Sequence, residues 1–84
     1  MYLEIITPEA KVFAGEVNSA TFPGSGGTFQ VLNDHAPMVS SLTEGTVKYV
    51  TTKGGEHTLQ IDGGVVEVLN NTISLLAEAI TQEA

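Results

Sequence analysis

The sequence contains no cysteine, no tryptophan and no arginine, and it has only three lysines against ten acidic residues. The absence of cysteine excludes disulfide bonds and thiolate metal sites, and it fits a reducing compartment. The formal net charge is -7. Because binding to nucleic acid or to anionic lipid depends on clustered Lys and Arg side chains, the composition argues against both kinds of partner.

Long apolar runs are also missing. No stretch reaches the roughly 18 apolar residues of a membrane-spanning helix, so we expect no direct insertion into lipid. The opening Met-Tyr-Leu-Glu lacks the basic and apolar regions of a signal peptide. No stretch has a helical period, and there is no internal repeat, linker or low-complexity segment. At 84 residues and 42% apolar composition, the chain is expected to fold as one domain over residues 1–84.

What the sequence does contain is a series of short runs rich in β-branched and aromatic residues, separated by turn residues. This pattern predicts an all-β fold of about nine or ten short strands, arranged as a two-sheet β-sandwich or flattened barrel. The expected strands are Tyr2 to Thr7, Lys11 to Ala14, Val17 to Phe22, Thr28 to Leu32, Met38 to Leu42, Thr46 to Thr52, His57 to Asp62, Val65 to Leu69 and Thr72 to Ala77. Residues 78–84 are expected to form a polar tail, in which a helix could start but would be too short to be stable alone.

Several local features refine this prediction. Gly15 is expected to end the second strand, and the weakly apolar third strand is expected at a sheet edge. In the strand from Val65 to Leu69, Val66 and Val68 are predicted to face the core. Val65 and Leu69 then face away, where they must meet water or a partner. The pair Asn70-Asn71 suits a two-residue turn, because Asn tolerates positive φ.

The stretch from Phe22 to Leu42 is the most irregular part of the chain and the first candidate for function. It begins with Pro23-Gly24, which is expected to break the preceding strand, and continues through Ser25, Gly26 and Gly27 to the polar Thr28. This Gly-rich run lacks the Gly-Lys-Ser/Thr ending of a phosphate-binding loop, and no helix is expected after it. We therefore interpret it as a shaped loop between strands.

A catalytic site is not favoured by the same stretch, although Asp34, His35, Ser40 and Ser41 are close in sequence. Neighbouring Asp34 and His35 point to opposite faces of an extended segment, whereas a hydrolytic triad requires the acid to orient the base. A turn aspartate and a packing histidine are the preferred interpretation. His35 and His57 have no metal-ligand spacing and the acids are scattered, so no metal or other cofactor is expected.

One modification site remains an alternative. Lys53 is expected at the tip of a hairpin in a small acidic β-domain, as the cofactor-bearing lysine is in lipoyl and biotinyl carrier domains. Its neighbours Thr52 and Gly54 differ from the residues that usually flank that lysine. A prosthetic-group carrier with Lys53 as the attachment site is therefore the second functional hypothesis, beside an exposed lysine that keeps the turn soluble.

Three ordered motifs resemble a known family over nearly the whole chain. They are YLEIITPEAKVFAGEVNSATFPGSGG, then GGTFQVLNDHAPMVSSLTEGTVKY, then IDGGVVEVLNNTISLLAEAI. Together they resemble the N-terminal β-sandwich domain of the ε subunit of proton-translocating F-type ATP synthases. The chain departs from the family pattern at Asn33-Asp34 and at Glu44, where Pro-Gly turns are usual. It also departs at Thr28, where many members carry an acid.

The resemblance implies a function through contact rather than catalysis. Members of the family sit in the central stalk, pack against the γ shaft and the membrane c-ring, and help to transmit rotation for ATP synthesis. It also implies a peripheral location on the cytoplasmic face of the bacterial inner membrane. The family's two-helix C-terminal domain has no counterpart in this sequence, so no nucleotide binding is expected.

By position, the resemblance assigns two contact surfaces. The residues expected to meet the c-ring are Pro23, Gly24, Ser25, Gly26, Gly27, Thr28, Asp62, Gly63 and Gly64. His35 and Ser40 are expected to lie towards γ.

Overall fold

The computed structural model describes residues 1–83, which form strands joined by short turns and no helix. The strands in this range are β1 (Tyr2–Ile6), β2 (Lys11–Gly24), β3 (Gly27–Leu32), β4 (Met38–Leu42), β5 (Gly45–Thr51), β6 (Glu56–Ile61), β7 (Gly64–Leu69), β8 (Thr72–Ala77) and β9 (Ile80–Glu83). The all-β prediction is thus confirmed. No helix of the described residues is long and apolar enough to cross a bilayer.

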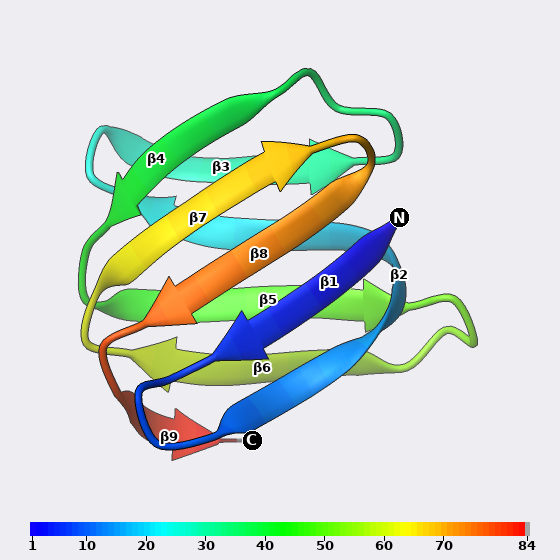
Figure 1. The fold of residues 1–84 in the computed structure, drawn as a ribbon. Coiled ribbons are helices and arrows are strands. Elements are labelled where there is room, and N and C mark those ends of the chain that lie inside the picture. The colour runs from blue at the N-terminus through cyan, green and yellow to red at the C-terminus, as the bar shows by residue number, and fades with distance from the viewer. Residues whose placement is uncertain (84) are drawn as a thin grey trace.

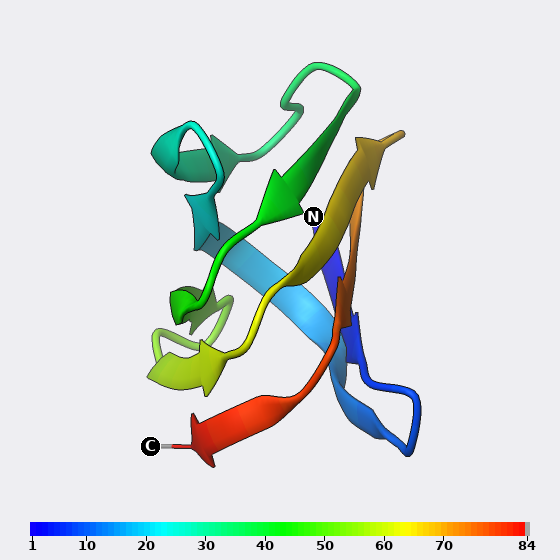
Figure 2. The same ribbon diagram turned by 90° about the vertical axis from the view of Figure 1, so that its left-hand side faces the viewer.

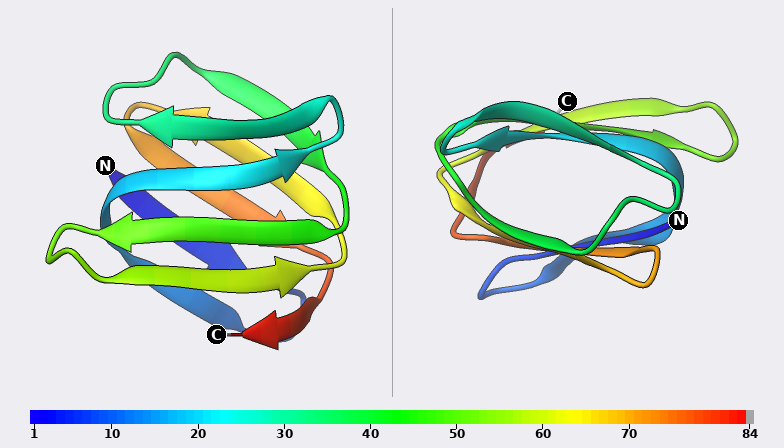
Figure 3. Two further views of the ribbon diagram at one scale, coloured as in Figure 1. Left: turned by 180° about the vertical axis from the view of Figure 1, so that it is seen from behind. Right: turned by 90° about the horizontal axis from the view of Figure 1, so that it is seen from above.

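The strands stack in two layers that face each other across the core (Figure 1). One layer, layer I, has the order β4-β7-β8-β1 and continues into the first half of β2. The other, layer II, contains β3, the second half of β2, β5, β6 and β9. Seen from above, the two layers form a flattened ring (Figure 3), as the sandwich prediction requires.

Strand β2 belongs to both layers, which corrects two of the predictions. Gly15 does not end a strand, because it pairs with Leu3 of β1 within a ladder that runs on into the rest of β2. Nor does the second half of β2 lie at an edge, since β3 and β5 flank it on its two sides. The continuous strand therefore links the two layers covalently.

Pro23-Gly24 also remains within β2 instead of breaking it. Pro23 lacks a backbone N–H, but its carbonyl oxygen accepts a hydrogen bond from the Thr43 N–H at 2.9 Å. Gly24 pairs with Gly27 of β3 and with Leu42 of β4. These contacts continue the ladder to the end of the strand.

The last strand is a further correction. Residues 78–84 were predicted as a polar tail, yet Ile80–Glu83 form β9, which pairs antiparallel with β6. The partly buried Ile80 packs against the core, and the otherwise open edge of β6 supplies the hydrogen bonds. Ala84 lies outside the described residues.

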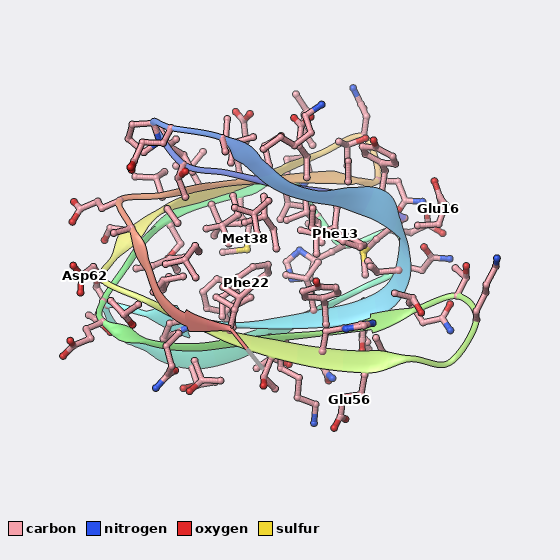
Figure 4. The ribbon with its side chains drawn as sticks, turned by 90° about the horizontal axis from the view of Figure 1, so that it is seen from below. Phe13, Glu16, Phe22, Met38, Glu56 and Asp62 are labelled. Carbon is pink, nitrogen blue, oxygen red and sulfur yellow. The ribbon has the colours of Figure 1, made fainter. Side chains whose placement is uncertain are left out.

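The core lies between the layers and is made of alternate residues of each strand. Figure 4 shows Phe13, Phe22 and Met38 pointing into this space, whereas Glu56 and Asp62 point outwards. Val66 and Val68 are buried, and Val65 and Leu69 are 45% and 47% exposed, as the alternation predicted. The fully buried residues of largest volume are Phe22, Leu3, Ile5, Ile61, Ile73, Leu75, Val17, Val31, Val47, Val66 and Val68.

In two tight connections the backbone φ angles agree with the residue types found there. Asn70 and Asn71 have φ of 51° and 59°, which confirms the two-residue turn between β7 and β8. Gly64 has φ of +154°, and a Cβ added to it would lie 2.3 Å from the carbonyl oxygen of Leu76. Only glycine lets the start of β7 approach the backbone of β8 so closely.

We expect Phe22→Ala to lower the free energy of unfolding by about 3–5 kcal/mol, because it removes a fully buried ring and leaves a cavity. The ring also lies 5.7 Å, centroid to centroid, from that of Phe29. Urea titration followed by circular dichroism measures the change. The control Leu32→Ala alters a side chain that is 52% exposed, so it should cost less than about 1 kcal/mol. Equal losses in the two variants would contradict the assigned core.

We expect Gly64→Ala to destabilise the protein by at least about 2 kcal/mol, because the methyl group meets backbone in a conformation that L-residues avoid. The matched control is Gly26→Ala, where an added Cβ has no neighbour within 4 Å. That variant should stay within about 0.5 kcal/mol of the parent. Thermal unfolding of both proteins compares them directly, and a fully stable Gly64→Ala protein would refute the close approach.

Candidate functional site

Four connections gather at one end of the molecule, on the left in Figure 1 and towards the viewer in Figure 2. They join β2 to β3, β4 to β5, β6 to β7 and β8 to β9, and comprise residues 25–26, 43–44, 62–63 and 78–79. We call this region the loop end. The strands that these connections join belong to both layers.

Leu42 is the point where the predicted c-ring residues meet. This last residue of β4 pairs with Gly24 of β2 and with Gly64 of β7. The Gly-rich run after Pro23 and the turn after Asp62 are therefore brought to the same end of the fold, although about forty residues separate them in the sequence. The two segments are thus close in the fold, and their shared contact with a c-ring stays a prediction.

Backbone hydrogen bonds join the loops to one another. The N–H of Ser25 donates to the carbonyl oxygen of Ser41 at 3.0 Å, on the other side of the gap between β2 and β4. The N–H of Glu78 donates to Gly63 at 3.0 Å, and that of Asp62 donates to Ala79 at 3.1 Å. Because each bond fixes one loop against another loop or against a neighbouring strand, we expect the loop end to behave as a single unit.

Side chains add to this network and also set the chemistry of the surface. The hydroxyl groups of Ser25 and Ser41 lie 2.9 Å apart. Pro23 and Gly24 are buried, so they shape the loop, whereas the exposed surface begins at Ser25. The exposed residues of the loop end are polar or glycine and include the acids Glu44, Asp62 and Glu78.

A shallow groove of about 510 Å³ lies beside the loop end on the outside of layer II. Its lining includes Thr21, Thr28, Thr46 and Lys48, and no histidine. Gly27 has φ of +131°, and an added Cβ there would meet no atom within 4 Å, so its need for glycine comes from the backbone alone. The polar groups of the groove are threonine hydroxyls, with Glu44 and Lys48 as its charged side chains.

His35 lies at the opposite end of the molecule, in the connection between β3 and β4 (Figure 1). That connection is fixed to the turn between β7 and β8, because the Asp34 N–H donates to Asn71 Oδ1 at 2.8 Å. Ser40 lies within β4, where it pairs with Val66 and is half-buried. The two residues predicted to face γ thus occupy a different part of the fold from the loop end.

The residues considered for a hydrolytic triad are engaged elsewhere. His35 Nδ1 lies 2.8 Å from the carbonyl oxygen of Ala36, and the Ser40 hydroxyl donates to the carbonyl oxygen of Ser41 at 3.0 Å. The backbone of Asp34 has φ of +61°, which turns the chain at this point. Asp34 therefore lies in a turn, as predicted, and His35 contacts the carbonyl group of its neighbour.

His57, Lys53 and the acidic residues give no further site. His57 stacks on Tyr49 with ring centroids 5.2 Å apart. Lys53 is exposed in the turn between β5 and β6, as predicted for the tip of a hairpin. The described residues contain no group of three or more His, Asp or Glu side chains placed to hold a metal ion.

Comparison with known proteins supports one family. Residues 1–83 match the model of the ATP synthase Delta/Epsilon chain β-sandwich domain. The ATP synthase epsilon chain of Chlorobaculum tepidum is 43% identical over 79 residues, which are 94% of this chain and 90% of that relative. The corresponding chain of Bordetella petrii is 33% identical over 84 residues, which are all of this chain and 60% of the relative.

Solved structures show the same fold at lower identity. A chain in the cryo-EM structure of the Euglena gracilis mitochondrial ATP synthase OSCP/F1/c-ring matches with a TM-score of 0.86 and 18% identity, over 95% of this chain and 51% of that chain. A chain of the Tetrahymena thermophila mitochondrial ATP synthase central stalk/c-ring matches with a TM-score of 0.77 and 19% identity, over 96% and 65%. The fold, the family model and the sequence relatives agree, and the chain therefore belongs to the ATP synthase delta/epsilon-chain β-sandwich family.

Proposed function

We propose that this chain is a non-catalytic rotor subunit of a proton-translocating F-type ATP synthase. In this proposal it lies in the central stalk on the cytoplasmic face of a bacterial inner membrane. It joins the c-ring to the γ shaft, so that rotation of the ring drives ATP synthesis. Family membership supports the assignment of the chain to an ATP synthase complex. The geometry of the fold supports the mechanical role.

The observation that carries the proposal is the hydrogen-bonded loop end. A part that transmits torque must resist shear between the surfaces on which its partners act. Here, segments of both layers are joined by backbone bonds at one end, and β2 runs through both layers. Relative sliding of the layers would break several hydrogen bonds together and would bend a continuous strand, so the domain is stiff.

We propose one partner for each of the two predicted contact surfaces. The loop end, with the exposed residues from Ser25 to Thr28 and Asp62, is proposed to meet the polar loops of the c-ring. His35 and Ser40 are proposed to lie towards γ. Because the loop end and His35 occupy opposite ends of the molecule, the domain can contact two partners at once (Figure 1).

The carrier hypothesis, with Lys53 as the attachment site, stays as the alternative. Its support is the exposed position of Lys53 in the turn between β5 and β6. Family membership favours the rotor hypothesis, because the match extends over residues 1–83. The two hypotheses are separated by measuring the intact mass of the chain after co-expression with a lipoyl or biotinyl ligase. The rotor hypothesis predicts the unmodified mass.

We expect the purified chain to form a complex with the γ subunit, and that complex to bind the c-ring. In His35→Ala, the stability should change by less than about 1 kcal/mol, because the side chain is only half-buried, while assembly with γ should weaken. In Gly27→Asp, binding to the c-ring should weaken, with some loss of stability from the positive φ. Co-purification and thermal unfolding measure the two effects separately.

Lys53→Ala is the control, since it changes an exposed turn residue that belongs to neither set of proposed contact residues. It should leave assembly with γ and with the ring unchanged. A parent chain that fails to bind γ under conditions where it is folded would refute the proposed function.

A further inference from the structure

One peptide group at the loop end is not held by any hydrogen bond. It joins Asp62 to Gly63 in the connection between β6 and β7, and among the described residues neither the Asp62 carbonyl oxygen nor the Gly63 N–H has a partner. The groups on either side are held. The Asp62 N–H donates to the carbonyl oxygen of Ala79 at 3.1 Å, and the Glu78 N–H donates to that of Gly63 at 3.0 Å. A free peptide group therefore lies between two fixed points.

Such a group can rotate about the line between the Cα atoms of Asp62 and Gly63. The rotation changes ψ of Asp62 and φ of Gly63 in opposite directions, and it breaks no hydrogen bond. Gly63 has φ of +137° and, without a Cβ, reaches negative φ about as readily. A side chain at this position would resist the rotation, because its Cβ would start 3.3 Å from the carbonyl oxygen of Leu42. The Gly63 nitrogen is therefore free to turn towards the Asp62 side chain.

The Asp62 side chain offers a reactive partner to that nitrogen. It is exposed and points outwards (Figure 4), and no ion pair among the described residues includes it. The carboxyl carbon of an aspartate and the nitrogen of the next residue close a five-membered ring when they bond. Glycine as the next residue adds no side chain that would crowd this ring. The electrophile and the nucleophile of an intramolecular reaction thus lie next to each other in the chain.

We propose that Asp62 is a modification site, at which aspartate converts to isoaspartate in the folded chain. In the first step the Gly63 nitrogen attacks Cγ of the protonated Asp62 carboxyl group. A C–N bond forms, the nitrogen loses its proton, and one water leaves to give a cyclic imide. In the second step one water adds to the imide at the former backbone carbonyl group and breaks its bond to the nitrogen. The chain then runs through Cβ and Cγ of residue 62, and no oxidant or cofactor takes part.

Isoaspartate would change the loop end, because it adds one carbon atom to the backbone between two hydrogen-bonded groups. The Asp62 N–H and the Gly63 carbonyl oxygen would lie farther apart along the chain, while Ala79 and Glu78 keep their spacing. The two bonds cannot both keep their present lengths. The modification therefore separates the β6–β7 connection from the β8–β9 connection, with no net change in mass or formal charge. It requires no partner protein, so it does not depend on the proposed function.

Asp34 provides an internal comparison, since it lies in the connection between β3 and β4 and is also exposed. Here the next backbone N–H, that of His35, donates to the carbonyl oxygen of Leu32 at 3.2 Å. The His35 nitrogen can attack the Asp34 carboxyl group only after this bond has broken. We therefore expect the fold to slow isomerisation at Asp34 but not at Asp62.

The test measures how strongly the fold slows isomerisation at each aspartate. The purified chain is incubated at mildly acidic pH, both in its native state and in urea, and both samples are analysed by peptide mapping. Chromatography separates isoaspartyl from aspartyl peptides, and mass spectrometry detects the imide, which is lighter by one water. Circular dichroism confirms that the native sample stays folded. The ratio of the native rate to the rate in urea removes the intrinsic difference between Asp-Gly and Asp-His and leaves the effect of the fold.

We expect the native rate at Asp62 to stay within about twofold of its rate in urea, because no hydrogen bond has to break. At Asp34 the native rate should fall at least about fivefold below the rate in urea, because the His35 N–H must first leave its acceptor. In the modified chain, the amides of Asp62 and Glu78 should lose their slow hydrogen exchange. Suppression of the reaction at Asp62 as strong as that at Asp34 would overturn the proposal.

Two variants at the same position check the chemistry. Asp62→Glu keeps the charge but would have to close a six-membered ring, so it should abolish the reaction at this position. Asp62→Asn should form the same imide with loss of ammonia instead of water, so the native variant should gain aspartate and isoaspartate there. A native Asp62→Asn chain that keeps its amide, while the same variant loses ammonia in urea, would also overturn the proposal. So would an Asp62→Glu chain that loses water at this position as fast as the parent.

Discussion

Close backbone approach at one end of the sandwich is the constraint on which the structure depends. Leu42 lies between Gly24 and Gly64, so strands of both layers converge on one residue. The approach of Gly64 to the backbone of β8 leaves no room for a side chain. With the loops fixed to one another by hydrogen bonds, the two layers cannot slide independently. The chain has only 84 residues and no cysteine, so disulfide bonds cannot stiffen it. Its stiffness comes from this backbone geometry.

This stiffness gives physical content to the proposed role in the rotor. The described residues contain no cluster of His, Asp and Glu that could hold a metal ion, and the His35 imidazole and the Ser40 hydroxyl each contact a backbone carbonyl group rather than one another. What it offers instead is a fixed arrangement of surfaces: a polar loop end, and exposed apolar side chains on layer I that include Val39, Val65 and Leu69. Differences between the sides of the domain, held at constant geometry, support the proposal that it contacts different partners on different sides.

Much of the fold could be predicted from the sequence because a two-residue period is a strong signal wherever one face is buried. The alternation from Val65 to Leu69 correctly separated the buried Val66 and Val68 from the exposed Val65 and Leu69. The errors came where local residue preference and tertiary pairing disagree. Gly15 has the local character of a strand end, but a partner strand keeps it within β2. The polar residues of β9 carry too weak a pattern to reveal a strand that exists because the edge of β6 is available.

The positions of the candidate contact residues in the fold were predictable in part, whereas their contacts with partners stay predictions. The family resemblance grouped the Gly-rich run with the turn at Asp62, and the structure brings the two together at Leu42. The hydrogen bonds between loops have no sequence signature, because they join backbone atoms of residues that are distant in the chain.

The claim that the loop end is one rigid unit is tested most directly by native-state hydrogen exchange of its backbone amides. The account predicts that the N–H groups of Ser25, Thr43, Asp62 and Glu78, each donating to another loop or strand, exchange as slowly as amides of the core strands. Exchange of these four amides at the rate of an unprotected loop, while the core strands stay protected, would show that the loops move independently and would contradict it.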